Sequence, residues 1–194
     1  MFRYASDQAL YFDRPPRETD LAALARIDGV VNLHPAYEST LIVFDPLRTT
    51  HEAVERAARL AATAEQRPGR HHTIPVFYDG PDLLAVAEHH SMAGERVIEL
   101  HASAEYSVAF LGFVPGFAYL TGLPAALHTP RRAEPRQVVP AGALGIAGAQ
   151  TGIYPRTTPG GWQLIGRTPV ELFDPAGDPM SLLQPGDRVT FFPA

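Results

Sequence analysis

Blocks of apolar residues alternate with polar turns over the first eighty residues, and the apolar spacing changes between two periods. Four blocks have the β-branched and aromatic character of strands, whereas two others place apolar residues at helical intervals. The predicted strands span residues 4–12, 30–33, 40–44 and 74–78. In chain order the blocks predict strand, helix, strand, strand, helix and strand, which is the order of a split βαβ plait.

Both predicted helices of this region have recognisable ends. Thr19 is placed to cap a short helix that Gly29 would end. The apolar positions of this helix are Leu21, Leu24 and Ile27. The second helix follows Thr49-Thr50-His51-Glu52, which has capping-box spacing, and Pro68-Gly69 stops it. Its apolar positions are Val54, Ala57, Ala61 and Ala64. Residues 1–80 are therefore expected to form an α/β plait domain.

Two further helical segments, residues 82–90 and 93–101, predict a connector over residues 81–104. A pair of short helices is also typical of a helix-turn-helix that reads DNA. The second segment, however, carries Glu95 and Glu99 and a single basic residue other than histidine, Arg96. Because an acidic helix does not suit a nucleic-acid groove, we favour a connector that packs on the following domain.

Residues 105–194 have the short apolar runs and the dense glycine and proline of a closed β-barrel. The expected strands are residues 108–113, 144–147, 162–165, 170–173 and 188–192. Residues 139–168 alone contain seven of the sixteen glycines and the only tryptophan, Trp162. These glycines suit the tight turns of a barrel. Alternatively, backbone N–H groups in glycine-rich turns can surround an anion or a carbonyl oxygen.

Composition narrows the class of protein. The 194 residues carry a formal charge of −5, which argues against a nucleic-acid binder because phosphate neutralisation needs a basic face. The first residues contain no apolar signal region, and no run approaches the length of a membrane span, so we expect no membrane association. The absence of cysteine excludes disulfides and thiolate chemistry and fits a cytoplasmic location.

All sixteen basic residues other than histidine are arginine. The lack of lysine excludes Schiff-base chemistry and a P-loop lysine, so any bound phosphate would rest on arginine and backbone amides. The histidine pairs His71-His72 and His89-His90 do not present two ligands on one face, because adjacent side chains point in different directions. We therefore predict no metal site built from the residues of this chain.

Four motifs of the second half resemble one known family. They are Gly-Phe-Val-Pro-Gly-Phe-Ala-Tyr-Leu at 112–120, Thr-Pro-Arg-Arg at 129–132, Gly-Ile-Ala-Gly-Ala-Gln-Thr-Gly-Ile-Tyr-Pro at 145–155 and Pro-Gly-Gly-Trp-Gln-Leu-Ile-Gly-Arg-Thr at 159–168. The family is the B subunit of bacterial ATP-dependent 5-oxoprolinase, also named allophanate hydrolase subunit 1 or carboxyltransferase domain. Kip-type inhibitors of sporulation histidine kinases belong to it as well. The resemblance is strong over residues 72–192 and looser before them.

The resemblance implies an α+β chain, with an N-terminal α/β plait domain and a C-terminal cyclophilin-like closed β-barrel. It also implies two partner chains, a homologous C subunit plus an A subunit, and a cytoplasmic hydrolase whose B subunit is inactive on its own. Together these subunits would hydrolyse 5-oxo-L-proline to L-glutamate with ATP and Mg²⁺. The B and C subunits would activate the lactam by phosphorylating its carbonyl oxygen.

Arginine is the residue type that this chemistry needs, because its planar fork holds carboxylate and phosphoryl oxygens bidentately. Arg131 and Arg167 are the candidate catalytic arginines, and Arg132 is a candidate substrate ligand. The alternative for Arg131 and Arg132 is a surface ion pair with Glu134 or Glu105.

His101 is the candidate acid or base, since it can titrate near neutrality. The alternative is a histidine that is favoured at a helix C-terminus by the helix dipole.

Polar and aromatic side chains around the glycine-rich stretch complete the candidate substrate site. These substrate-binding candidates are Phe113, Tyr119, Gln150, Thr151, Tyr154, Gly160, Gly161 and Trp162. The alternative for the aromatic residues is a place in the barrel core.

Two functions stay open at this point. The first is the B subunit of the ATP-dependent amidase, and the second is a regulatory protein that binds and inhibits a sensor histidine kinase. The sequence also leaves open whether the substrate is 5-oxoproline, allophanate, a urea derivative or another cyclic amide. Activity gained only with ATP and the C subunit would select the enzyme, and kinase binding without ATP turnover would select the regulator.

Overall fold

Two antiparallel strands begin the chain in the computed structural model, which describes residues 1–14, 18–61 and 69–194. β1 (Phe2–Ser6) pairs with β2 (Ala9–Phe12) across a turn at Asp7 and Gln8. In this turn the Gln8 N–H donates to the Ser6 Oγ at 3.3 Å. The single strand expected over residues 4–12 is therefore a hairpin, because the local side-chain bond of Ser6 favours a turn.

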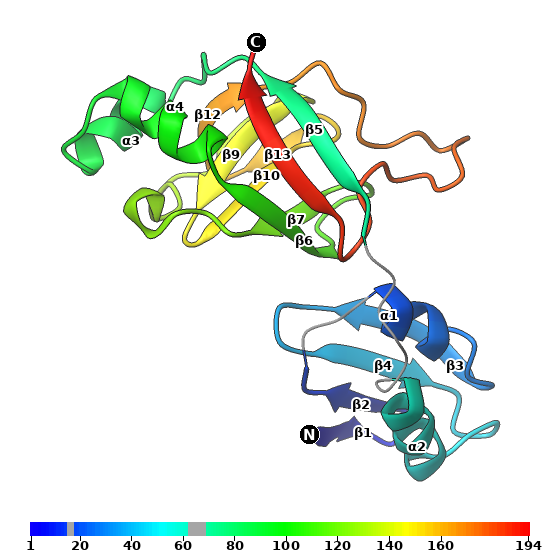
Figure 1. The fold of residues 1–194 in the computed structure, drawn as a ribbon. Helices are drawn as coiled ribbons and strands as arrows, with labels where there is room; N and C mark the ends of the chain where they lie inside the picture. The colour runs from blue at the N-terminus through cyan, green and yellow to red at the C-terminus, as the bar shows by residue number, and fades with distance from the viewer. Residues whose placement is uncertain (15–17, 62–68) are drawn as a thin grey trace. The chain divides into compact units, whose positions relative to one another are not determined.

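The first unit, residues 1–68, contains a four-stranded antiparallel sheet in the order β1-β2-β4-β3 (Figure 1). β3 (Val30–Pro35) and β4 (Thr40–Phe44) were expected, and so were two helices, α1 (Glu18–Leu24) and α2 (His51–Ala61). The helices pack on one core with the sheet. The core includes Leu10, Leu24, Ile42, Phe44, Val54 and Ala58.

The helix starts differ slightly from the prediction. α1 begins at Glu18, so Thr19 lies inside it and is not its cap, and Gly29 takes a positive φ of 83° in the turn before β3. α2 is capped by Thr50, whose Oγ accepts the Ala53 N–H at 3.3 Å, one residue later than the expected Thr49 box. Ala64 lies outside the described residues.

The plait prediction fails at its last strand. β5 (His71–Val76) lies parallel to β13 (Arg188–Pro193) in the second unit, and β1 supplies the fourth strand of the first sheet instead. The division between units consequently falls after Pro68, whereas the sequence placed it at residue 80. The apolar alternation of β5 indicates which side chains are buried, but it carries no information about the strand that β5 pairs with.

The second unit, residues 69–194, is built on a seven-stranded sheet in the order β12-β9-β10-β7-β6-β13-β5. Five strands have not yet been introduced: β6 (Glu105–Leu111), β7 (Ala118–Thr121), β9 (Ala143–Ala147), β10 (Gln150–Ile153) and β12 (Gln163–Arg167). The sheet curls into a half-barrel (Figure 1), and all neighbours except β13 and β5 are antiparallel. With its few helices, the chain is mixed α+β.

The two edge strands of this sheet meet beyond the end of β5. Phe77 and Arg167 exchange two backbone hydrogen bonds, each 2.8 Å long. Farther along, the Gly80 N–H donates to the Ile165 carbonyl and the Asp82 N–H to the Leu164 carbonyl. A Cβ at Gly166 would lie 2.6 Å from the Phe77 oxygen, and a Cβ at Gly80 would lie 2.3 Å from the Ile165 carbonyl carbon. Glycine at both positions therefore lets the two edge strands approach this closely. We call this contact between residues 77–82 and 164–167 the seam.

The inside of the curl holds the larger core. Leu144 and Ile146 of β9, Ile153 of β10 and Val189 and Phe191 of β13 all point into it. The expected connector forms two helices, α3 (Leu83–His89) and α4 (Gly94–Ala102), which pack on the same core through Val86 and Val97. Among the described residues, no helix has the length and apolarity that crossing a membrane requires.

One expected strand is absent from the structure, and four observed strands were not expected. Residues 170–173 form no strand, since Leu172 is buried in the core and Phe173 makes a single bridge with Ser181. The apolar run there reflects burial without strand pairing. Conversely, β7 and β10 were not predicted, and neither was the separate ribbon of β8 (Arg136–Val139) and β11 (Thr158–Gly160). A short 3-10 helix, η1 (Ala125–Leu127), precedes that ribbon.

Candidate functional site

A second apolar layer covers the outer face of the half-barrel. Along β9, Ala143 and Ala147 face this layer while Leu144 and Ile146 face the inner core, as strand alternation requires. Aromatic rings fill the layer and meet edge to face, for example Phe117 and Trp162 with centroids 5.4 Å apart. We call the following residues the outer aromatic cluster: Phe113, Phe117, Tyr119, Tyr154 and Trp162.

Several glycines of residues 139–168 lie against these rings, where a side chain would not fit. A Cβ at Gly152 would lie 3.1 Å from the Phe117 ring and 3.2 Å from the Trp162 ring. A Cβ at Gly160 would lie only 2.4 Å from the Tyr154 hydroxyl oxygen. Gly142 and Gly148, by contrast, adopt positive φ as turn glycines do. The glycine density therefore serves two purposes, turns and ring packing.

Two tyrosine hydroxyls give this layer a polar side. The Tyr154 hydroxyl makes a hydrogen bond with the backbone of Trp162, and burial nevertheless raises the pKa of Tyr154. Burial also raises the pKa of Tyr119. The positive charge of Arg131 opposes both shifts, and the charge of Arg136 opposes the shift of Tyr154. Phe113, at the edge of the cluster, is 58% exposed and has a positive φ of 66°.

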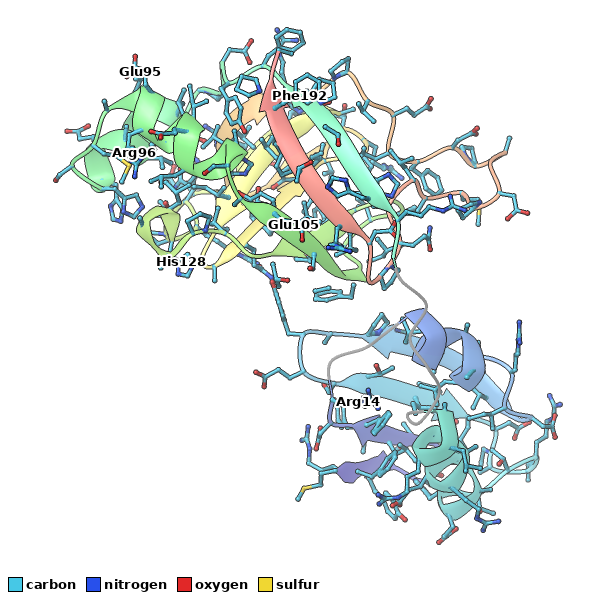
Figure 2. The ribbon with its side chains drawn as sticks, viewed as in Figure 1. Arg14, Glu95, Arg96, Glu105, His128 and Phe192 are labelled. Carbon is cyan, nitrogen blue, oxygen red and sulfur yellow. The ribbon has the colours of Figure 1, made fainter. Side chains whose placement is uncertain are left out.

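Arg131 is exposed and makes no ion pair with any carboxylate of the described residues. The expected alternative partner Glu105, on β6 (Figure 2), pairs with Arg188 at 3.4 Å instead. An exposed guanidinium that has no ion pair with a described carboxylate can bind an anionic group of a ligand.

Arg132 has a different role from Arg131. Its Nη1 lies 3.1 Å from the Oδ1 of Asp82, a carboxylate that is only 4% exposed. Arg136 Nη2 lies 2.7 Å from the same oxygen, and the Leu164 N–H donates to Oδ2 at 2.7 Å. One carboxylate thus serves two guanidinium groups. Arg132 Nε and Arg136 Nη1 are buried and have no hydrogen-bond partner in the described part of the chain.

Arg167 lies apart from the aromatic rings of this cluster, at a pocket of about 320 Å³ beside the seam. Its Nε donates to the Asp79 Oδ2 at 3.0 Å, and its Nη2 forms an ion pair with the same oxygen at 2.8 Å. The guanidinium also lies 4.8 Å from the centre of the Phe77 ring. Arg136 and Val138 from β8 also line this pocket, together with Ala143 and Leu164 from the outer face.

His101 lies in the inner core and has no exposed surface. Its Nδ1 lies 2.9 Å from the Tyr78 hydroxyl and its Nε2 lies 3.0 Å from the Thr151 Oγ. Since the Thr151 hydroxyl donates to the Gly145 carbonyl, Nε2 donates to Thr151 and Nδ1 accepts from Tyr78. Burial lowers the pKa of His101 to about 3, so the ring is neutral at physiological pH.

Most of the candidates therefore separate into three places. The outer face brings together Phe113, Tyr119, Tyr154, Gly160 and Trp162, and the charge of Arg131 acts on its two tyrosines. Arg132 and Arg167 lie at the Asp82 group and the neighbouring pocket. His101 and Thr151 lie together on the inner face, where solvent does not reach them. Gln150 begins β10 and its buried Nε2 has no partner among the described residues, and Gly161 accepts the Arg132 N–H through its carbonyl.

Sequence reasoning missed Asp79, Asp82 and Arg136. Asp82 directly precedes α3, a position where aspartate ordinarily caps a helix, yet it makes no side-chain cap bond there. No local signal distinguishes it from an ordinary cap. The histidine pairs have structural partners, since His72 bonds Asp187 at 2.9 Å and His90 bonds Thr129 at 2.9 Å. Within residues 1–14, 18–61 and 69–194, no group of three or more acidic or histidine side chains could hold a metal.

Comparison with known proteins matches residues 17–183 to the family model "Carboxyltransferase domain, subdomain C and D". A protein of Escherichia coli O157:H7, named as the B subunit of 5-oxoprolinase, is 51% identical over 176 residues, which cover 88% of this chain and 81% of that protein. The protein of the same name from Haemophilus influenzae is 56% identical over 126 residues, or 63% of this chain and 59% of that one.

Among solved structures, the crystal structure of TTHA0988 is similar with a TM-score of 0.82 and 37% identity. That likeness covers all of this chain but only 40% of the TTHA0988 chain. The chain thus spans less than two thirds of TTHA0988 and of the Haemophilus protein, and about four fifths of the Escherichia coli protein.

Proposed function

The chain belongs to the carboxyltransferase-domain family, and on that premise we propose that it is the B subunit of an ATP-dependent 5-oxoprolinase. The observation that carries the proposal is its 51% identity, over most of both chains, to a protein of that name. Its proposed partners are a homologous C subunit plus an A subunit, and its location is the cytoplasm. The substrates are 5-oxo-L-proline and ATP with Mg²⁺ on its phosphates.

In the proposed reaction the γ-phosphoryl group of ATP passes to the lactam carbonyl oxygen and ADP leaves. Water then attacks the activated carbon and the ring C–N bond breaks, which leaves an acyl phosphate on the side chain. A second water hydrolyses this acyl phosphate to L-glutamate and phosphate. The B subunit would be inactive on its own, because the site needs the C subunit. Positive charge at the transferring group is the contribution that an arginine makes to such a step.

Arg131 and Arg167 are the residues that we propose to hold the transferring phosphoryl group and the substrate carboxylate. Arg131 is supported by its exposure, by its lack of an ion pair with a described carboxylate and by the effect of its charge on Tyr119 and Tyr154. Arg167 is supported by its position at a pocket. The outer aromatic cluster would form the apolar wall of the site.

His101 is better suited to positioning than to proton transfer. Its ring has no exposed surface, and burial lowers its pKa to about 3, far below the range that a general base at neutral pH needs. It links α4 to β10, which carries Gly152 of the outer face. We therefore propose that His101 and Thr151 hold the sheet beneath the site.

At the level of fold, we propose that the second unit is a closed barrel of the cyclophilin-like type. The residue pair Phe77–Arg167, which joins the two edge strands, supports closure. The β8–β11 ribbon covers part of the outer face of this barrel, where Val139 of β8 packs in the outer apolar layer.

Reconstitution tests this function directly. The chain is co-purified with its C subunit, and ATP hydrolysis dependent on 5-oxoproline is measured with the A subunit present and then omitted. Glutamate formation that requires all three chains supports the proposal. A stable complex that hydrolyses allophanate or urea, but not 5-oxoproline, would contradict the proposal that 5-oxoproline is the substrate.

The arginine roles are tested in the same assay. Arg167→Ala should lower the rate, whereas Arg188→Ala is the matched control, because Arg188 forms an exposed pair with Glu105 on β6. Equal rates for these two variants would show that Arg167 does not take part in the reaction.

A further inference from the structure

The charges around the pocket beside the seam do not balance. Arg132 and Arg136, both partly exposed, share the single buried carboxylate of Asp82, so this group of three carries a net positive charge. Arg167 and Asp79 at the same pocket neutralise each other. A partly buried positive charge without a compensating partner is unfavourable, and a bound anion removes that cost.

Hydrogen bonding is incomplete at the same place. Arg136 lines the pocket, its Nη2 is held by Asp82, and its Nη1 has no partner within the described residues. Buried donors of this kind are rare in folded proteins, and a site for an ion or ligand is one of their ordinary explanations. The side chain is 22% exposed, so part of it is open to a ligand.

The remaining pocket wall is largely apolar. Pro81, Val138, Pro140, Ala143 and Leu164 line it beside the two arginines. A volume of about 320 Å³ is near the lower end for pockets that bind small molecules. An inorganic anion gains nothing from such a wall, whereas a small ring that bears one carboxylate uses both the wall and the cation.

The pair at the pocket can rearrange at small cost. The Arg167 and Asp79 side chains are 59% and 52% exposed, and exposed ion pairs contribute little to stability. Arg167 is therefore available to a second anion, while Arg136 is fixed by the buried Asp82.

We propose that this pocket binds the carboxylate of a small cyclic acid between Arg136 and Arg167, with the ring of the acid on Val138 and Leu164. Resting on the function proposed above, that acid is 5-oxo-L-proline, and Arg136 is the residue that selects for its carboxylate. The lactam carbonyl then lies toward the part of the site that the C subunit would supply.

Direct binding to the full chain tests the pocket without catalysis. Titration calorimetry would use 5-oxo-L-proline, 2-pyrrolidinone, which has the same ring without the carboxylate, and inorganic phosphate. We expect 5-oxoproline to bind at least tenfold more tightly than either of the other two. Absence of 5-oxoproline binding to the chain, or equal binding of 2-pyrrolidinone or phosphate, would overturn the proposal.

Two variants of Val138 isolate the charge effect. Val138 is 65% exposed at the pocket, so Val138→Glu and Val138→Gln change its rim with nearly the same shape and should both fold. The glutamate should weaken 5-oxoproline binding at least tenfold relative to the glutamine, because it repels the ligand carboxylate. Equal affinities for the two variants would place the ligand elsewhere.

Arg136→Gln should abolish binding, with circular dichroism to confirm folding. Its control is Arg96→Gln on α4 (Figure 2), an exposed residue paired with Glu99, which should bind as the unaltered chain does. If Arg136→Gln does not fold, the comparison of Val138→Glu with Val138→Gln tests the proposed pocket by itself.

Failure of this proposal and failure of the proposed function are distinguishable. If the complex hydrolyses 5-oxoproline and Val138→Glu leaves its KM equal to that of Val138→Gln, the pocket proposal is wrong and the function stands. If the chain binds 5-oxoproline with the expected charge dependence but the complex does not hydrolyse it, the pocket stands and the function is wrong.

Discussion

Asp82 Oδ1 accepts a hydrogen bond from Arg136 Nη2 at 2.7 Å, which joins the start of α3 to strand β8 across 54 residues of sequence. The other oxygen of the carboxylate binds the Leu164 N–H of β12. Asp82 therefore ties the connector helices, the β8–β11 ribbon and the edge of the half-barrel together beside the candidate site.

Replacement of Asp82 should be strongly destabilising. Asp82→Ala leaves two guanidinium groups without their carboxylate, and loss of one partner from a buried ion pair costs about 3–5 kcal/mol. Asp79→Ala is the control, since its pair with Arg167 is exposed and should contribute at most about 1 kcal/mol. Urea unfolding measures both. Similar losses for the two variants would show that burial of Asp82 does not matter.

His101 should make stability depend on pH in a defined direction. The folded chain keeps His101 neutral because burial lowers its pKa from 6.5 to about 3, whereas the unfolded chain binds a proton near 6.5. Between these values the unfolded state binds more protons, so stability falls as pH decreases below 6.5, by about 1.4 kcal/mol per pH unit for this group. Above pH 6.5 the contribution is constant.

The comparison that isolates this effect uses His101→Gln. Free energies of unfolding at pH 7.5 and pH 5.5, chosen to be roughly one unit on either side of the ordinary histidine pKa, should differ more for the native chain than for the variant. Parallel curves for the two proteins would mean that His101 titrates in the folded state as it does in the unfolded one.

Gly160 and Gly161 are adjacent but should differ in their tolerance of a side chain. A Cβ at Gly160 would lie 2.4 Å from the Tyr154 hydroxyl, whereas one at Gly161 would meet Pro135 at an ordinary 3.6 Å. Gly160→Ala should destabilise the fold by about 1–3 kcal/mol, as overpacking does, and should change Trp162 fluorescence. Gly161→Ala should change neither. An equal response of both variants would contradict the packing described for Tyr154.

Arg131 and Arg132 should separate activity from stability. Arg131→Ala should leave the unfolding free energy almost unchanged and reduce 5-oxoproline-dependent ATP hydrolysis of the complex by about 10²-fold, the effect of one lost transition-state contact. Arg132→Ala should reduce stability first, because Arg132 binds the buried Asp82. Steady-state rates and thermal unfolding of the same preparations test this, and a stable, fully active Arg131→Ala would exclude Arg131 from catalysis.

Local patterns predicted much of the fold. The capped helix α2, the two connector helices and strands β3, β4, β9, β12 and β13 all lie where the spacing of apolar residues placed them. Such patterns depend on neighbours a few residues apart, which sequence shows directly. β7 and β10 were missed because each has only four residues, too few to establish a period against glycine-rich surroundings.

The sequence indicated which residue types surround the candidate site, but it did not indicate how they are arranged. The aromatic candidates do gather on one face of the sheet. His101 was a candidate for proton transfer because a histidine can titrate near neutrality, yet its bonds to Tyr78 and Thr151 lie in the core. Arg136 was not predicted as a site residue, because no neighbour in the sequence indicates that it shares Asp82 with Arg132.

The sequence by itself determined the family, the order of most helices and strands, and the residue types available for anion binding, because motifs and periodicity are local. Only the tertiary structure decided that β5 pairs with β13, that His101 is buried and neutral, and that two arginines share one carboxylate. Those outcomes depend on contacts between residues 50 or more positions apart, such as His101 with Thr151 and Asp82 with Leu164. Burial and strand pairing at that separation are settled by the packing of the whole unit.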